Sequence, residues 1–172
     1  MRKSIIAALL VFSLFNSGRA EEVAIPGTSV TFDAPEGFTT LTAQEIAGKF
    51  PANRAPKFVV GNKRRTTTIA YDLKPHKISA DELEEFKGTL EQLFKQLIPG
   101  LAWKDKKMIE LAGQEWIFLE MTSTAVDTDI HNIMLATPHK GALLIFNFNS
   151  TKEEFPEVEK SLRKSLKSIS IK

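Results

Sequence analysis

Two stretches of this chain are apolar at every position, and this limits its fold more than any other feature. They are residues 116–119, with the sequence WIFL, and residues 143–146, with the sequence LLIF. Alternate residues of a β-strand face opposite sides of its sheet, so a strand with one side in water alternates apolar and polar residues. Because these two stretches do not alternate, both faces of the sheet that contains them must be covered.

Strand patterns occur along most of the chain. Runs rich in β-branched and aromatic residues, bounded by turn residues, predict strands at 29–32, 58–61, 66–73, 104–111, 114–124, 129–137 and 142–149. The last four strands follow one another with turn residues at 112–113 and 138–141 between neighbours. These four strands are therefore expected to form an antiparallel meander.

Three capping boxes predict helices. Thr42 with Glu45 precedes a short helix to Phe50, and Ser79 with Glu82 precedes a longer helix that Pro99 and Gly100 end. A third box, Thr151 with Glu154, predicts that the last helix begins near Thr151. The two longer helices carry apolar stripes, formed by Leu83, Phe86, Leu90, Leu93, Phe94 and Leu97 in one and by Phe155, Val158, Leu162, Leu166 and Ile169 in the other.

Three helices are enough to cover both faces of the sheet. The predicted fold class is therefore α+β, a three-layer α/β/α sandwich with a mainly antiparallel central sheet.

The N-terminus has the layout of a secretory signal peptide. Arg2 and Lys3 precede an apolar run over 5–15, and Gly18 and Ala20 are small residues before an expected cleavage site. The run is shorter than the approximately 20 residues that span a bilayer. We expect residues 1–20 to be removed and residues 21–172 to form a single periplasmic or secreted domain, with no stable membrane insertion.

Charge and cysteine content exclude several functions. Arg2, Lys3 and Arg19 belong to the expected signal peptide, and removing these three from 23 basic residues leaves 20 against 21 acidic residues. Binding to nucleic acid rests on a clear basic excess, so nucleic acid is not an expected partner. The chain has no cysteine, which excludes disulfides, thiol catalysis and cysteine ligation of metals.

The order of these elements resembles the PsbP/DcrB-like superfamily. The resemblance rests on the opening 30–38 (VTFDAPEGF), the long helix before the meander, the turn 111–116 (LAGQEW), and the strand end 148–150 (FNS) before a final helix that contains Phe155. It covers nearly the whole of 21–172. It implies an exported protein-binding or assembly module that is not an enzyme, and it assigns no functional residue.

Catalytic and cofactor motifs are missing from the sequence. It contains no glycine-rich phosphate loop, no His-Glu-x-x-His zinc motif and no nucleophile elbow. Ser161 and Lys164 match the Ser-x-x-Lys spacing of penicillin-binding enzymes, but the companion motifs are absent and Ser161 lies beside the apolar stripe of a helix. We therefore expect neither an enzyme nor a cofactor.

Asp127, Asp129 and His131 are the candidate metal ligands, because residues two apart on a strand project to one face. A hairpin with a hydrogen-bonded histidine is the favoured alternative. His131 shares its side with apolar residues, and tight hairpins would place Thr122 and Phe148 beside it, neither of which is a strong ligand.

Candidate partner-binding residues are basic or aromatic. Lys63, Arg64 and Arg65 could form an anion-docking tip or simply a solvated turn. The lysines of 104–107 could dock a partner or protect an edge strand from aggregation. Of the two tryptophans, Trp116 is predicted to lie in the core, and Trp103 is the candidate anchor for a partner.

The leading functional expectation is an exported, non-enzymatic module that binds another envelope or secreted protein. The alternatives are a small-ligand or metal carrier with a pocket between helix and sheet, and an immunity-type inhibitor of an exported toxin.

Overall fold

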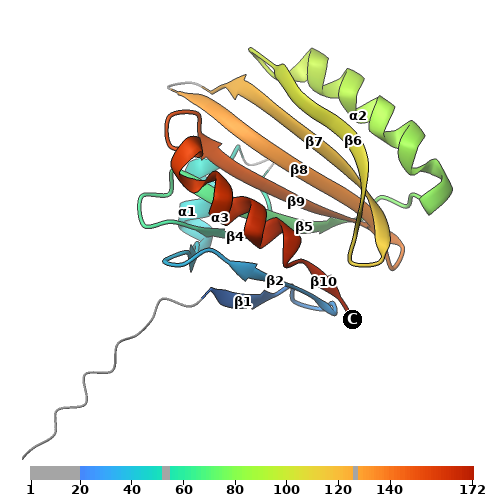
Figure 1. Ribbon diagram of the computed structural model, residues 1–172, viewed down its shortest axis with the longest axis horizontal. Helices are drawn as coiled ribbons and strands as arrows, with labels where there is room; N and C mark the ends of the chain where they lie inside the picture. The colour runs from blue at the N-terminus through green and yellow to red at the C-terminus, as the bar shows by residue number, and fades with distance from the viewer. Residues whose placement is uncertain (1–19, 52–54, 126–127) are drawn as a thin grey trace, which may run out of the picture.

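A computed structural model describes residues 20–51, 55–125 and 128–172, so most of the predicted signal peptide lies outside the described residues. The main sheet has seven antiparallel strands in the order β3-β4-β5-β9-β8-β7-β6, and a second sheet has the order β1-β2-β10 (Figure 1). The strands of the main sheet are β3 (Thr39–Thr40), β4 (Phe58–Gly61), β5 (Thr67–Lys74), β6 (Ala102–Leu111), β7 (Gln114–Thr124), β8 (Asp129–His139) and β9 (Ala142–Thr151). Those of the small sheet are β1 (Glu21–Ala24), β2 (Val30–Ala34) and β10 (Ser170–Ile171).

The predicted meander is confirmed. Strands β6, β7, β8 and β9 are antiparallel neighbours in chain order. Two of its hairpins turn at Ala112-Gly113 and Lys140-Gly141, and all four of these residues have positive φ. Two-residue hairpin loops of type I′ need this backbone at both central positions.

The first face of the main sheet carries the larger core. Trp116, Phe146 and Phe148 project from this face and are fully buried. The helix α3 (Phe155–Lys167), which lies in front of the sheet in Figure 1, and strand β2 pack against them. The core on this face therefore joins both ends of the described chain to the meander.

The second face is covered at its two ends. The helix α2 (Leu83–Leu97) packs on β7 and β8 through Leu83 and Leu90. The short helix α1 (Ala43–Lys49) packs on β4 and β5 through Ile46. Apolar residues of 116–119 and 143–146 belong alternately to the cores on these two faces. The expectation that both faces are covered therefore holds at the two ends of the second face but not over its middle strands.

Two of the predicted capping boxes are present and the third is not. Thr42 caps α1 and Ser79 precedes a 3₁₀ turn that leads into α2, each with its glutamate in reciprocal contact. The prediction that the last helix begins near Thr151 is wrong, because β9 extends to Thr151 and α3 begins at Phe155. Thr151 Oγ1 accepts the Glu154 N–H at 3.2 Å, but the Glu154 carboxylate accepts from β5 and from the β4–β5 turn instead.

The sequence patterns did not predict three short strands. β1, β3 and β10 have two to four residues each and exist through pairing with β2 or β4. No helix among the described residues is long and apolar enough to cross a membrane.

Candidate functional site

Helix α2 exposes part of its predicted apolar stripe. Leu83 and Leu90 are buried, but Leu93 is 43% exposed and Leu97 is 51% exposed. They are the exposed large hydrophobic residues of the described chain. The helix predicted from the stripe is therefore present, but these two leucines of the stripe are not buried.

The geometry of α2 shows which way these leucines face. Glu91 lies on the flank of the helix toward β6, because its carboxylate pairs with Lys106. At 100° per residue, Leu93 lies about 60° from the buried Leu90 on the side away from Glu91, and Leu97 lies only about 20° from Leu90 on that side, at the last residue of the helix. In the strand order, that direction leads over β8 and β9 toward β5.

A cavity of 590 Å³ lies over these central strands of the second face. Its floor is formed by β5, β9 and β8, and one wall is formed by Lys49 at the end of α1 with Phe50, Pro51 and Pro56. Most of the lining is apolar and includes Phe50, Pro51, Pro56, Ile130, Met134 and Ile145. α1 and α2 cover the two ends of this face, and the cavity lies on the strands between these ends.

The cavity floor contains side-chain amides. Asn147 and Asn149 line it from β9, and Asn149 Nδ2 donates to Asn132 Oδ1 of β8 at 2.6 Å. Asn147 Oδ1 is buried and has no hydrogen-bond partner among the described residues, and the same holds for Thr68 Oγ1. Thr68 lies opposite Asn149 in the β5–β9 register. Buried polar atoms without partners are rare in proteins, and two of the three in the described chain lie on or beside this floor.

Charged residues at the cavity are two lysines and one aspartate. Asp72 accepts from Lys74 Nζ at 2.7 Å and from the Leu73 N–H at 2.8 Å. Lys49 Nζ donates to the Arg65 backbone oxygen at 2.8 Å. The lining therefore has one more positive than negative group.

His131 belongs to a network on the opposite face. Its Nε2 is 2.8 Å from Glu120 Oε1, and its ring stacks on Phe155 with centroids 3.4 Å apart. Arg163 Nη2 donates to both oxygens of Glu120, at 2.8 and 3.0 Å. Burial raises the pKa of Glu120, but hydrogen bonds from His131 and Arg163 outweigh it and hold this pKa below 4.5. His131 is thus a hydrogen-bonded core residue, and its neighbours are Thr122, as predicted, and Ser150 rather than Phe148.

Asp129, another candidate metal ligand, lies apart from this network. Asp129 accepts from Thr124 Oγ1 at 3.1 Å and from Lys152 Nζ at 3.4 Å. Asp127 lies outside the described residues. Among the residues that the structure describes, no group of three or more His, Cys, Asp or Glu side chains could hold a metal ion.

The predicted basic tip is divided between structural and exposed residues. Arg65 donates to Glu45, to Thr39 and to the Gly61 backbone oxygen, so its guanidinium holds α1 and β3 to the β4–β5 turn. Arg64 is paired with Glu154 although its side chain is 70% exposed. Lys63 is exposed at the turn.

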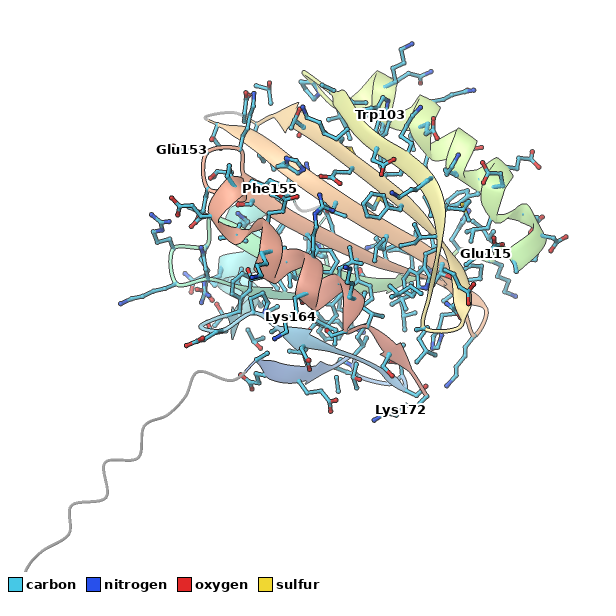
Figure 2. All side chains as sticks on the ribbon, in the orientation of Figure 1. Trp103, Glu115, Glu153, Phe155, Lys164 and Lys172 are labelled. Carbon is cyan, nitrogen blue, oxygen red and sulfur yellow. The ribbon has the colours of Figure 1, made fainter. Side chains whose placement is uncertain are left out.

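Trp103 is half-buried beside α2 on β6 (Figure 2). Lys106 Nζ lies 5.3 Å from the centre of its ring. Together with Leu101 and residues of α2 it lines a shallow hollow of 380 Å³. β6 is an edge of the main sheet, which confirms the edge position predicted for the lysines of 104–107, whereas Trp116 is fully buried as predicted.

The sequence patterns did not predict the cavity as a site. Its lining comes from four separate parts of the chain, so no local motif marks it. One signal was available: Asn132, Asn147 and Asn149 interrupt strands whose other residues are mostly apolar, on a face that must be covered. A polar residue at such a position indicates either a partner side chain or a site.

These features define a mixed α/β protein with a large antiparallel sheet, helices on both faces and a cavity over the middle of one face. No family model matches the chain and no curated protein matches it. It is similar to the solution structure of cyanobacterial PsbP (CyanoP) from Synechocystis, with a TM-score of 0.60 and 14% identity over 95% of this chain and 99% of that chain.

Two further solved structures share the fold. LpqN of Mycobacterium tuberculosis, a protein involved in cell envelope biogenesis, has a TM-score of 0.55 and 16% identity over 88% of this chain and 90% of its own. A protein of unknown function from Pseudomonas aeruginosa has a TM-score of 0.53 and 12% identity over 90% of this chain and 99% of its own. The chain thus has the PsbP-like fold, which confirms the resemblance drawn from its sequence.

Proposed function

We propose that this chain is an exported, non-catalytic module that acts by binding another protein of the envelope or the extracellular space. Its scaffold would be the three-layer sandwich, with α3 and the small sheet as one outer layer and α1 and α2 as the other. The observation that carries the proposal is the exposure of Leu93 and Leu97 on α2.

The two leucines form a compact contact surface. Residues four apart are neighbours on a helix, so Leu93 and Leu97 lie one turn apart on the same flank of α2. Single exposed apolar residues are ordinary, but these two are adjacent and are the exposed large hydrophobic residues of the described chain. Adjacent exposed apolar side chains of this kind mark interaction sites.

The charges near this end of α2 define the partner more closely. Lys95 lies in the last turn of the helix and is exposed, and Lys106 of β6 pairs with Glu91 on the flank of α2 that faces β6. A partner with an apolar centre and acidic residues on its β6 side would match this surface, because complementary charges steer association.

The predicted signal peptide supports a function outside the cytoplasm. The signal-peptide pattern of 1–20 predicts delivery to the periplasm or the medium, and LpqN, which shares the fold, is involved in cell envelope biogenesis. N-terminal sequencing of the protein recovered from the periplasm or medium is expected to begin at Glu21. An uncleaved chain found only in the cytoplasm would contradict this part of the proposal.

The docking surface is tested by affinity capture with tagged residues 21–172 from a native envelope extract. The wild type is expected to retain a stoichiometric protein that the Leu93→Gln/Leu97→Gln variant retains at least tenfold less. The matched control is Gln92→Ala/Gln96→Ala, which changes two exposed residues of the same helix and is expected to retain the protein fully. Equal retention by the leucine variant, or no specific protein at low and moderate salt, would refute the proposal.

A further inference from the structure

We propose that the cavity over β5, β9 and β8 binds a small amphiphile with one negative charge, an apolar body that carries a carboxylate. This site is separate from the protein-docking surface on α2. Neither proposal depends on the other.

The size of the cavity fits a small molecule. Its 590 Å³ lies within the range of roughly 300–1,000 Å³ that is usual for small-molecule sites. Such sites are mainly apolar with a few polar groups that orient the ligand, and this cavity has that composition. Phe50, Pro51 and Pro56 form an apolar wall, and Met134 and Ile145 form apolar parts of the floor.

The amides of the floor provide the orienting polar groups. Asn147 lies between Ala70 of β5 and Met134 of β8 in the registers of the sheet, so small and apolar side chains surround it. Its Oδ1 has no hydrogen bond to lose among the described residues. Rotation of the amide can therefore present either its donor or its acceptor to a bound molecule. A ligand that hydrogen-bonds to Asn147 Oδ1 removes the cost of a buried unpaired group.

The charges of the lining favour an anion. Lys49 and Lys74 outnumber the single acid, Asp72. The Asp72 carboxylate is already occupied by Lys74 Nζ and two backbone N–H groups, so it has little capacity left for a cation. Lys74 Nζ has three donors, and its side chain is 45% exposed, so it can also donate to a carboxylate at the cavity mouth.

Two other occupants fit the cavity less well. A divalent cation would need several oxygen ligands, but Asp72 is the only carboxylate in the described lining and is already paired. A folded protein partner would bury roughly 800 Å² of each surface, which is far more than this cavity offers. A small anionic amphiphile fits the volume, the polarity and the charge together.

Binding is tested with residues 21–172 and two probes, the fluorescent anion 8-anilinonaphthalene-1-sulfonate and decanoate. We expect fluorescence enhancement at one site per chain and competition by decanoate. Calorimetry is expected to show decanoate binding at least fivefold more tightly than decanol, which has the same apolar chain and no charge.

Variants then locate the site. Ile145→Trp, which fills the cavity from its half-exposed floor, is expected to weaken both probes at least tenfold. Lys74→Met is expected to weaken decanoate about fivefold and leave decanol unchanged, whereas Asp72→Asn is expected to tighten decanoate. Lys104→Met on β6 is the control for loss of one surface lysine, and circular dichroism of each variant establishes that it is folded.

Several results would overturn the proposal. These are no binding of either probe at millimolar concentration, binding that folded Ile145→Trp leaves intact, and equal affinity for decanoate and decanol. The Leu93→Gln/Leu97→Gln variant separates the two proposals, because it is expected to lose the protein partner and to keep the probes.

Discussion

At the scale of single residues, one buried and one half-buried carboxylate join parts of the protein that are distant in sequence. Glu120 of β7 accepts from His131 and from Arg163 of α3. Glu154 accepts from Thr67 Oγ1 at 2.8 Å and also binds the β4–β5 turn. In both cases burial raises the pKa, and the hydrogen bonds and the nearby arginine lower it by more, so each pKa lies below the ordinary 4.5.

The Glu120 network predicts a pH-dependent stability. Glu120→Gln is expected to reduce the free energy of unfolding by about 2 kcal/mol at pH 7, because hydrogen bonds to a charged group are lost. A carboxyl group whose pKa is lower in the folded than in the unfolded protein stabilises the fold at pH values above its unfolded-state pKa. This stabilisation is lost as the pH falls through the folded-state pKa. The difference between wild type and variant is therefore expected to shrink below pH 4.5, measured by urea unfolding from pH 7 to pH 3.

Arg163 also pairs with Glu159, so Glu159→Gln is the matched control. Glu159 is more exposed and pairs with Arg163 along the helix at 2.7 Å, and this change is expected to cost less than 1 kcal/mol. A difference for Glu120→Gln that does not change with pH would contradict the assigned charge state.

The basic tip allows a second prediction. Arg65→Gln is expected to lower the free energy of unfolding by about 1–2 kcal/mol, because it removes hydrogen bonds to Glu45, Thr39 and the Gly61 backbone oxygen. Lys63→Gln, on the same turn, is expected to change it by less than about 0.5 kcal/mol. Chemical denaturation of the two variants measures the difference, and equal effects would mean that the Arg65 contacts contribute nothing to stability.

The tip also shows how far residue roles follow from sequence. The pattern Lys63-Arg64-Arg65 identifies a charged turn, and the structure has a turn there. It does not distinguish the exposed Lys63 from Arg65, because the partners of Arg65 are on α1 and β3, about twenty residues earlier in the chain. The partners of His131 were likewise predicted only in part. The predicted turn 138–141 would pair His131 with Phe148, whereas the two-residue turn Lys140-Gly141 pairs it with Ser150, two residues further on.

At the scale of elements, α2 carries more apolar residues than its contact with the sheet buries. The helix rests on a sheet along one face, and that contact is narrower than the stripe of six apolar residues in its sequence. Leu83 and Leu90 point into the contact, and Leu93 and Leu97 lie at its margin. The pattern therefore predicted the helix correctly, but these two leucines of the stripe are not buried.

This difference predicts unequal effects of the same substitution within one helix. Leu90→Ala is expected to lower the free energy of unfolding by about 2–4 kcal/mol, because it leaves a cavity in the core. Leu93→Ala is expected to cost less than about 1 kcal/mol, since the side chain is 43% exposed. Urea unfolding of both variants measures this, and a large loss for Leu93→Ala would show that this leucine supports the fold rather than a surface.

Other elements followed from local chemistry. The caps of α1 and α2, the turn at 112–113 and the strand limits of β7 depend on residues close in sequence, and the patterns predicted them. β1, β3 and β10 are too short to have a pattern of their own. They are strands because β2 and β4 offer unpaired backbone groups, which depends on the tertiary fold.

At the scale of the whole molecule, the two ends of the described chain close the structure together. β2 lies between β1 and β10 (Figure 1), so an early and a late segment share one small sheet. Ser165 Oγ donates to the Asp33 backbone oxygen at 2.6 Å, and Ser168 Oγ accepts the Asp33 N–H at 2.7 Å. Ile169, just after α3, is buried in the same core as Phe32.

This closure predicts that the last four residues stabilise the entire domain. Deletion of 169–172 removes a buried isoleucine and the β10–β2 pairing, and is expected to lower the free energy of unfolding by about 3–5 kcal/mol. Thermal unfolding is expected to remain a single transition at a lower midpoint, because one core joins the small sheet, α3 and the meander. Lys172→Ala, which keeps both Ile169 and β10, is the control and is expected to leave the midpoint within a degree or two of the wild type. A deletion that leaves the midpoint unchanged, or that separates unfolding into two transitions, would show that the small sheet is an appendage rather than part of the common core.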